Sequence, residues 1–98
     1  MDLQTLVKQP SESRLYNMDF RVLLDDGVTI AAVTSFVSSP TTVPPLTMDG
    51  PAFSDTVVQR RIAGGKHNTV YTVTCVIIDS EGNTVEGEGY LFVKDLPT

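Results

Sequence analysis

Apolar and polar residues alternate along most of this 98-residue chain, in short runs bounded by glycines and prolines. Residues 16–24 are the clearest case, with apolar side chains at Tyr16, Met18 and Phe20 and polar residues between them. Successive side chains of an extended strand point to opposite faces, so this spacing predicts a strand with one apolar face. No stretch repeats apolar residues at the helical i, i+3, i+4, i+7 spacing over three turns.

Further strand patterns occupy residues 28–37, 55–62, 70–78 and 84–94. The third of these segments is the most apolar, and one of its faces holds Tyr71, Val73, Cys75 and Ile77. Its other face is also partly apolar. We therefore expect this strand to be central in a sheet, or to pack against a partner on its outer face.

Turn-forming residues separate these segments. The Asp-Asp-Gly sequence at 25–27 favours a tight turn, so we expect residues 16–24 and 28–37 to form a hairpin. Residues 38–51 contain four prolines, which lack the N–H that a central strand donates. This segment is expected to be a loop or a short edge strand. Gly87 and Gly89 interrupt the last predicted strand, where glycine is typical of a bulge or of a close approach by another backbone.

These elements predict an all-β fold, a single Ig-like β-sandwich of about seven short antiparallel strands. Val, Thr and Ile, the β-branched residues that favour extended chain, make up 29 of the 98 residues. The length fits one domain. We expect residues 1–10 to form an N-terminal arm and residues 11–98 to form the sandwich. A small barrel is the alternative architecture, and the lack of tryptophan and of paired cysteines excludes an antibody-type domain.

Charge and hydropathy argue against nucleic-acid and membrane binding. Seven basic and twelve acidic residues give a formal net charge of −5, and Arg60-Arg61 is the one adjacent basic pair. Nucleic-acid surfaces need clustered Lys and Arg. No apolar run approaches the ~20 residues that span a bilayer. The N-terminal sequence lacks the basic-then-apolar layout of a signal peptide, so we expect synthesis in a cytoplasm.

Reactive side chains are too few to predict catalysis. His67 is the single histidine and falls in a Gly-Gly-Lys-His-Asn turn, where we expect it to be solvated. Cys75 is the single cysteine, expected to be a small core residue whose thiol pKa is raised by burial. Neighbouring carboxylates such as Glu86 and Glu88 are expected to form a solvated strand face, because calcium needs six to eight oxygen ligands. We therefore expect no enzyme, no cofactor and no metal site.

The remaining features suggest contacts with other chains. The N-terminal arm, the proline-rich segment and the final strand each carry apolar residues, and Arg60 is a candidate because arginine is enriched at interface cores. Its alternative role is pairing with Glu86 or Glu88 across strands. The candidate partner-binding residues are Leu3, Leu6, Val7, Val43, Leu46, Arg60, Tyr90 and Phe92.

Several segments resemble a family of small tailed-phage virion proteins. In that family a proline and an acidic residue precede a Tyr-x-x-Asp-aromatic strand, as in QPSESRLYNMDF at residues 9–20. An Ile-x-Gly-Gly turn, a Tyr-Thr-Val-Thr strand and a polar glycine turn follow, and they match IAGG at 62–65, VYTVTC at 70–75 and DSEGN at 79–83. The final strand matches EGEGY at 86–90. The resemblance extends from Pro10 to Lys94.

This resemblance implies an Ig-like β-sandwich in the virion of a tailed bacteriophage, made in the cytoplasm of the bacterial host. It implies a non-enzymatic adaptor that links tail or connector proteins to fibre proteins. The implied partners are other virion proteins, with a homo-oligomeric ring as one arrangement, and no nucleic acid or membrane. Contact by an extended segment added to a sheet edge is one mode of binding.

Two alternatives remain open at this point. A capsid decoration protein needs the same rigid module and contact surface. A carbohydrate- or cell-surface-binding module is favoured by Tyr90 and Phe92, which would project outward together if the last strand is regular.

Overall fold

The computed structural model describes residues 2–94 and consists of β-strands with one short 3-10 turn. In chain order the elements are β1 (Asp2–Lys8), β2 (Ser13–Asp19), η1 (Arg21–Leu23), β3 (Ile30–Ser39), β4 (Leu46–Met48), β5 (Ala52–Ser54), β6 (Val57–Gly64), β7 (Thr69–Asp79) and β8 (Thr84–Val93). The last residues of the predicted domain, 95–98, lie outside the described residues.

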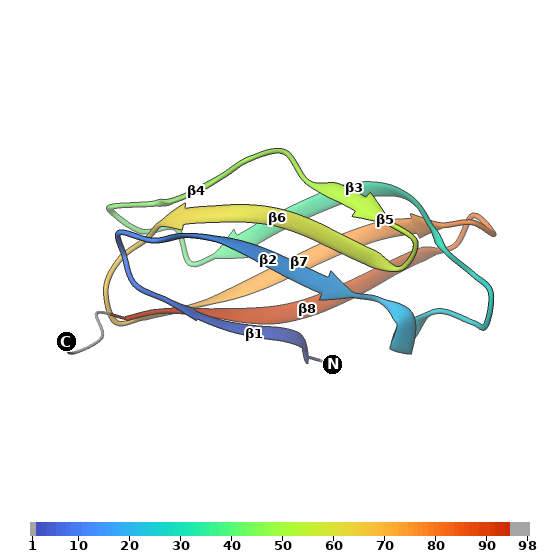
Figure 1. Cartoon of the computed structure of the whole chain (residues 1–98), viewed down its shortest axis with the longest axis horizontal. Helices are drawn as coiled ribbons and strands as arrows, with labels where there is room; N and C mark the ends of the chain where they lie inside the picture. Colours follow the sequence, from blue (N-terminus) through green and yellow to red (C-terminus); the bar gives the residue numbers. More distant parts are fainter. Residues whose placement is uncertain (1, 95–98) are drawn as a thin grey trace.

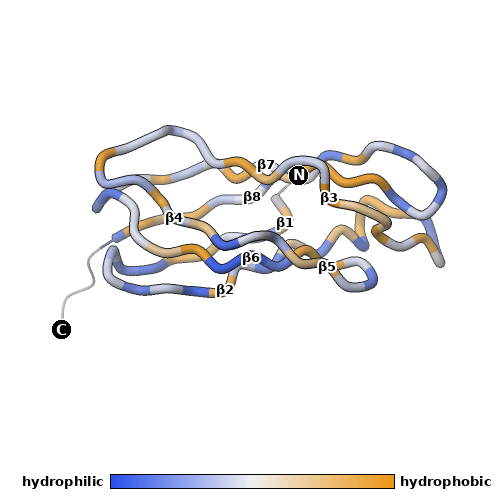
Figure 2. Tube along the Cα trace, turned by 90° about the horizontal axis from the view of Figure 1, so that it is seen from above, coloured by the Kyte–Doolittle hydropathy of each residue, from blue (hydrophilic) through white to orange (hydrophobic). Residues whose placement is uncertain are grey.

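The strands form two sheets packed face to face. One sheet has the order β1-β8-β7-β3, and the other has the order β2-β6-β4, with β5 also paired to β6. Figure 1 shows the strands running along the length of the molecule, and Figure 2 shows the two layers, with β7 and β3 in one and β2 and β6 in the other. The all-β sandwich is confirmed. The described residues contain eight strands instead of about seven, and the finer Ig-like assignment stays a prediction.

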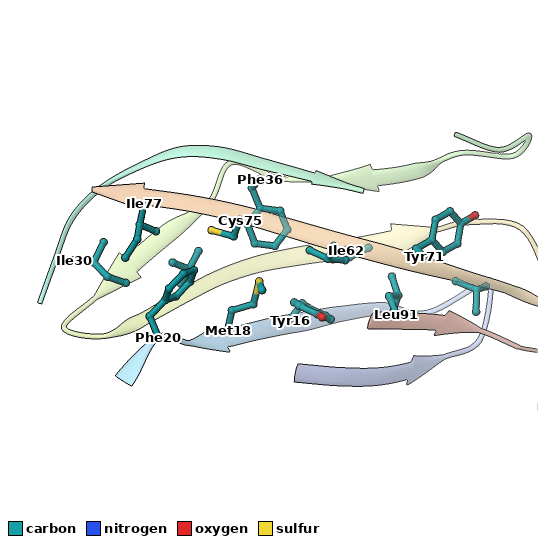
Figure 3. Packing of buried hydrophobic residues seen from close by; sticks show 13 residues of the cluster. Tyr16, Met18, Phe20, Ile30, Phe36, Ile62, Tyr71, Cys75, Ile77 and Leu91 are labelled. Atoms are coloured by element: carbon teal, nitrogen blue, oxygen red, sulfur yellow. The ribbon is translucent and has the colours of Figure 1, made fainter. Parts of the chain in front are cut away.

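The core lies between the sheets and follows the alternation seen in the sequence. The face of β7 predicted to be buried is buried, with exposed fractions of 0–1% for its four residues, Tyr71, Val73, Cys75 and Ile77. They meet side chains from β2 and β6 in one cluster, which Figure 3 shows with Ile30 at one end and Tyr71 at the other. Burial of this apolar surface is the main driving force for the fold.

The N-terminal segment differs from the expected arm. Asp2–Lys8 form β1, which pairs in parallel with β8 (Figure 1), so this strand pair is an exception to the predicted antiparallel arrangement. Leu3 and Leu6 pack against the core cluster. Lys8 is fully buried, and its Nζ donates to the backbone oxygen of Gln9 at 2.7 Å. These contacts make β1 part of the sandwich.

The expected hairpin between residues 16–24 and 28–37 is wrong, because β2 and β3 belong to different sheets. The tight turn itself is present, since the N–H of Val28 donates to the backbone oxygen of Asp25 at 3.0 Å. The apolar faces of both strands pack against each other across the core. The rings of Tyr16 and Phe36 meet there edge to face, with their centroids 6.4 Å apart.

The proline-rich segment contains a loop followed by a short strand, as predicted. Residues 40–45 form the loop, and β4 pairs with β6 at the side of the second sheet. The strand β5 follows and pairs with the other half of β6. The sequence did not predict β5.

Candidate interaction surfaces

The outer face of the β1-β8-β7-β3 sheet carries a row of apolar side chains across three strands. Val7 of β1 lies opposite Phe92 of β8, and Phe92 lies opposite Val70 of β7. Leu91 is fully buried, so its neighbours Tyr90 and Phe92 point to the outer face together. Val7 is 45% exposed and Val70 is 53% exposed. We call the surface formed by Val7, Val70, Tyr90 and Phe92 the β8 face.

Charged side chains border the β8 face. The Tyr90 hydroxyl donates to Glu88 Oε1 at 2.9 Å. The ammonium group of Lys94 lies 5.9 Å from the ring centroid of Phe92. An apolar centre with a charged border is the usual layout of a protein–protein interface.

The two candidates from the proline-rich segment lie in different surroundings. Val43, in the loop between β3 and β4, is 89% exposed. Leu46, the first residue of β4, packs against the core cluster and lies opposite Gly64 of β6. Val43 is therefore available to a partner, whereas Leu46 serves the fold.

Arg60 makes its contacts within the chain. Its Nη1 donates to the backbone oxygen of Phe36 at 2.9 Å, and its Nε donates to the backbone oxygen of Asp49. The guanidinium carbon also lies 5.1 Å from the ring centroid of Phe36, a cation–π distance. These groups take the place of the expected carboxylates of β8. Arg60 thus connects the edge strand β3 to the segment between β4 and β5.

The eight predicted residues therefore do not form one surface. Val7, Tyr90 and Phe92 lie together on the β8 face, and Val43 lies apart from them in its loop. Leu3, Leu6 and Leu46 pack against the core, and Arg60 is engaged internally. The sequence prediction missed Val70. The apolar character of the second face of residues 70–78 could have identified it as a candidate contact residue.

The single cysteine and the single histidine lie in different surroundings. Cys75 is fully buried, and burial raises the pKa of its thiol to about 12 although the nearby Arg60 guanidinium acts to lower it. The raised pKa confirms the expected direction, and it keeps the thiol protonated at neutral pH. His67 lies exposed in the turn between β6 and β7.

A shallow pocket of about 440 Å³ lies beside η1 and the turn at residues 25–28. Its lining includes Leu24 and Val28 together with the carboxylates of Asp25, Asp26 and Asp55. Within residues 2–94, no group of three or more His, Cys, Asp or Glu side chains is arranged to hold a metal ion. The described part of the chain also has no helix with the length and hydropathy of a membrane span.

The fold is a small all-β sandwich of two packed sheets. Residues 8–91 match the family model described as podophage GP4 fiber-tail adaptor protein gp77. This match spans most of the sandwich, and the chain belongs to that family. It is accordingly a structural adaptor protein of the phage virion that binds other virion proteins, and capsid decoration and carbohydrate binding are not favoured. A comparison with curated proteins found no match.

Proposed function

We propose that this chain bridges tail or connector proteins and fibre proteins without catalysing a reaction, and that the β8 face is one of its two contact surfaces. The observation that carries the proposal is the family match over residues 8–91. An adaptor needs a rigid body with surfaces on it, and the two packed sheets supply the rigid body.

The β8 face suits this role because its apolar row lies on paired strands instead of on a flexible segment. The ladder from Val7 through Phe92 to Val70 holds the three side chains in fixed register. Side chains that are already ordered lose less conformational entropy when a partner binds. Aromatic residues such as Tyr90 are also enriched among the residues that dominate binding energy.

Further parts of the proposal concern assembly and setting. The chain is made in the cytoplasm of the bacterial host and is incorporated in the virion as several copies, arranged as a homo-oligomeric ring around the tail. Cyclic symmetry is common among protein assemblies and gives each copy the same environment. The net charge of −5 argues against nucleic acid or an anionic membrane surface as a partner.

The test compares two variants, each with one carboxylate on the outer face of a different sheet, and measures how much of each is incorporated in phage particles. Val70→Asp puts a charge within the β8 face, and Leu15→Asp puts one on the other sheet, where Leu15 is 43% exposed. Phage lacking the wild-type gene are complemented with each variant, and incorporation is measured by quantitative mass spectrometry of purified particles. Urea unfolding of each purified variant verifies that it is folded.

We expect the Val70→Asp chain to be lost from particles and the Leu15→Asp chain to be retained. Normal incorporation of a folded Val70→Asp chain contradicts the role of the β8 face. The copy number of the wild-type chain, scaled to the major capsid protein, tests the setting. A number that fits a small ring supports a place at the tail. A number comparable to that of the capsid protein would contradict the adaptor, and absence from particles would contradict any role in the virion.

A further inference from the structure

The loop between β3 and β4 presents an apolar side chain on a fixed support. Val43 has the highest exposed fraction, 89%, among the large hydrophobic residues of the described chain. Single exposed valines are common on protein surfaces. Here the residues around Val43 are held by a set of hydrogen bonds that reaches back to the core, and this support distinguishes the loop. We call residues 40–45 the Val43 loop.

The first part of the support is a directional chain of hydrogen bonds through Tyr71. The N–H of Lys66 donates to the Tyr71 hydroxyl at 2.8 Å. The Thr42 hydroxyl donates to the backbone oxygen of Pro44 at 2.9 Å and lies 2.5 Å from the Tyr71 hydroxyl. Each hydroxyl carries one hydrogen, so Tyr71 must donate to Thr42. These hydrogen bonds therefore run in one direction, from the Lys66 amide to the Pro44 carbonyl. They hold Thr42 and Pro44, the two sequence neighbours of Val43.

The second part of the support fixes the end of the loop. The N–H of Gly65 donates to the backbone oxygen of Pro45 at 3.1 Å, and Leu46 follows directly and packs against the core. Gly65 has φ of +99°, and a Cβ built on it would lie 2.8 Å from Leu46 Cδ2. Glycine is thus needed here for the close approach of the two segments.

Tyr71 connects this support to the core. Its ring is 1% exposed and belongs to the central cluster, where Figure 3 shows it at one end with its hydroxyl directed away from the other labelled residues. The loop and the turn between β6 and β7 lie at the same end of the sandwich, and η1 lies at the opposite end (Figure 1). A buried side chain therefore sets the position of an exposed one.

We propose that the Val43 loop is a preformed plug that inserts Val43 into an apolar socket on a different virion protein, and not on a second copy of this chain. This inference rests on the proposed adaptor function and names its second contact surface, at the end of the sandwich. The chemistry of the socket follows from the residues around the loop. Val43 requires an apolar floor without unpaired polar groups. The exposed Lys66 beside the loop favours acidic side chains at the border of the socket.

The experiment is a competition between co-expressed chains for places in the particle. Val43→Ala removes two methyl groups from the plug, and we expect it to be depleted roughly tenfold against wild type, the ratio expected for losing about two buried carbon groups. Val22→Ala is the matched control, since Val22 is 67% exposed in η1 at the opposite end. Its ratio to wild type is expected to stay near one.

A second variant tests whether the support matters apart from the valine. Tyr71→Phe keeps Val43 but removes the hydroxyl in the middle of the hydrogen-bond chain. In the purified, folded variant we expect faster amide hydrogen exchange at Lys66 and Gly65, whose N–H groups bond to Tyr71 and to Pro45. We also expect depletion from particles. Unchanged exchange at both amides overturns the preformed plug.

The outcomes separate this inference from the proposed function. If Val43→Ala competes equally with wild type while Val70→Asp is excluded, the plug is wrong and the adaptor stands. If the wild-type chain is absent from particles, the adaptor itself is wrong. If the purified wild-type chain self-associates and Val43→Ala dissolves those oligomers, the socket lies on a second copy, and the proposed partner is overturned.

Discussion

The hydroxyl of Tyr16 occupies the space that a side chain at Gly89 would need. A Cβ built on Gly89 overlaps this hydroxyl and comes to 2.7 Å from the backbone oxygen of Gln4. The Tyr16 hydroxyl lies 3.1 Å from the backbone oxygen of Gln4 and 3.3 Å from that of Tyr90, and its single hydrogen is shared between these two acceptors. A residue of β2 thereby ties β1 and β8 together across the sandwich. The glycine in β8 makes this close approach possible, as the sequence predicted.

Replacing Gly89 with alanine should loosen β1. The added methyl group forces Tyr16 or Gln4 to move, and overpacking of this kind costs typically about 1–3 kcal/mol. We expect a loss of that size in the free energy of unfolding, measured by urea denaturation. Gly50→Ala is the control, because a Cβ there meets nothing within 4 Å. Equal stabilities of the two variants would contradict the close approach.

Tyr16→Phe tests the hydrogen bonds without adding volume. It leaves the backbone oxygens of Gln4 and Tyr90 without the phenol donor, and loss of such a bond costs about 1 kcal/mol. We expect the largest increase in amide hydrogen exchange in β1, which is joined to the rest of the sandwich through this tie and the β8 ladder. An increase spread evenly over β6 and β7 would point to general weakening of the core instead.

Alternation predicted which sides of β2 and β7 are buried but not which strands pair. The buried face of β7 was correct because the period of two is a property of one strand alone. The predicted hairpin of residues 16–24 and 28–37 was wrong because the alternation within a strand does not say which strand it pairs with. Two strands with apolar faces can lie side by side or face each other, and the contact of Tyr16 with Phe36 shows the second arrangement. A turn at Gly27 is compatible with both.

The surface residues of the N-terminal segment were harder to predict because β1 departs from regular alternation at one point. The register between β1 and β8 shifts between Asp2 and Thr5. Leu3 and Leu6 are three positions apart and would point to opposite faces of a regular strand. With this shift both of them pack against the core. Lys8 then falls on the buried side and Val7 on the exposed side. Hydropathy alone predicts the opposite for these last two residues.

Arg60→Ala should destabilise the fold, because Arg60 joins the two sheets. It lies opposite Tyr16 on β6, and its guanidinium reaches backbone oxygens of Phe36 and Asp49. Hydrogen bonds from a charged donor and a cation–π contact together suggest a loss of about 1–3 kcal/mol in the free energy of unfolding. Urea denaturation of the purified chain measures this loss.

Arg61→Ala provides the comparison for this variant. Arg61 is the exposed neighbour of Arg60, with one long hydrogen bond of 3.4 Å to the backbone oxygen of Ser13. Surface substitutions of this kind usually change stability by less than about 0.5 kcal/mol. If Arg60→Ala is as stable as Arg61→Ala, the guanidinium contributes nothing to holding the sheets together. Arg60→Lys should restore only part of the loss, because an ammonium group lacks the planar fork.

The thiol of Cys75 should make the fold less stable at high pH. Burial raises its pKa from the ordinary thiol value of 9.0 to about 12, so the unfolded chain loses this proton before the folded chain does. The stabilising contribution is fully present below pH 9.0 and is lost as the pH rises toward about 12. Within that window the free energy of unfolding should fall by up to about 1.4 kcal/mol per pH unit from this group.

Comparison with Cys75→Ala isolates the effect of the thiol. All other ionisable groups are the same in the two chains, so their contributions cancel in the difference between the two free energies of unfolding. At neutral pH wild type should be the more stable chain, because alanine leaves part of a fully buried site empty. The difference should shrink above pH 9.0 and then reverse. Parallel curves for the two chains across this window would show that Cys75 ionises equally in the folded and unfolded states.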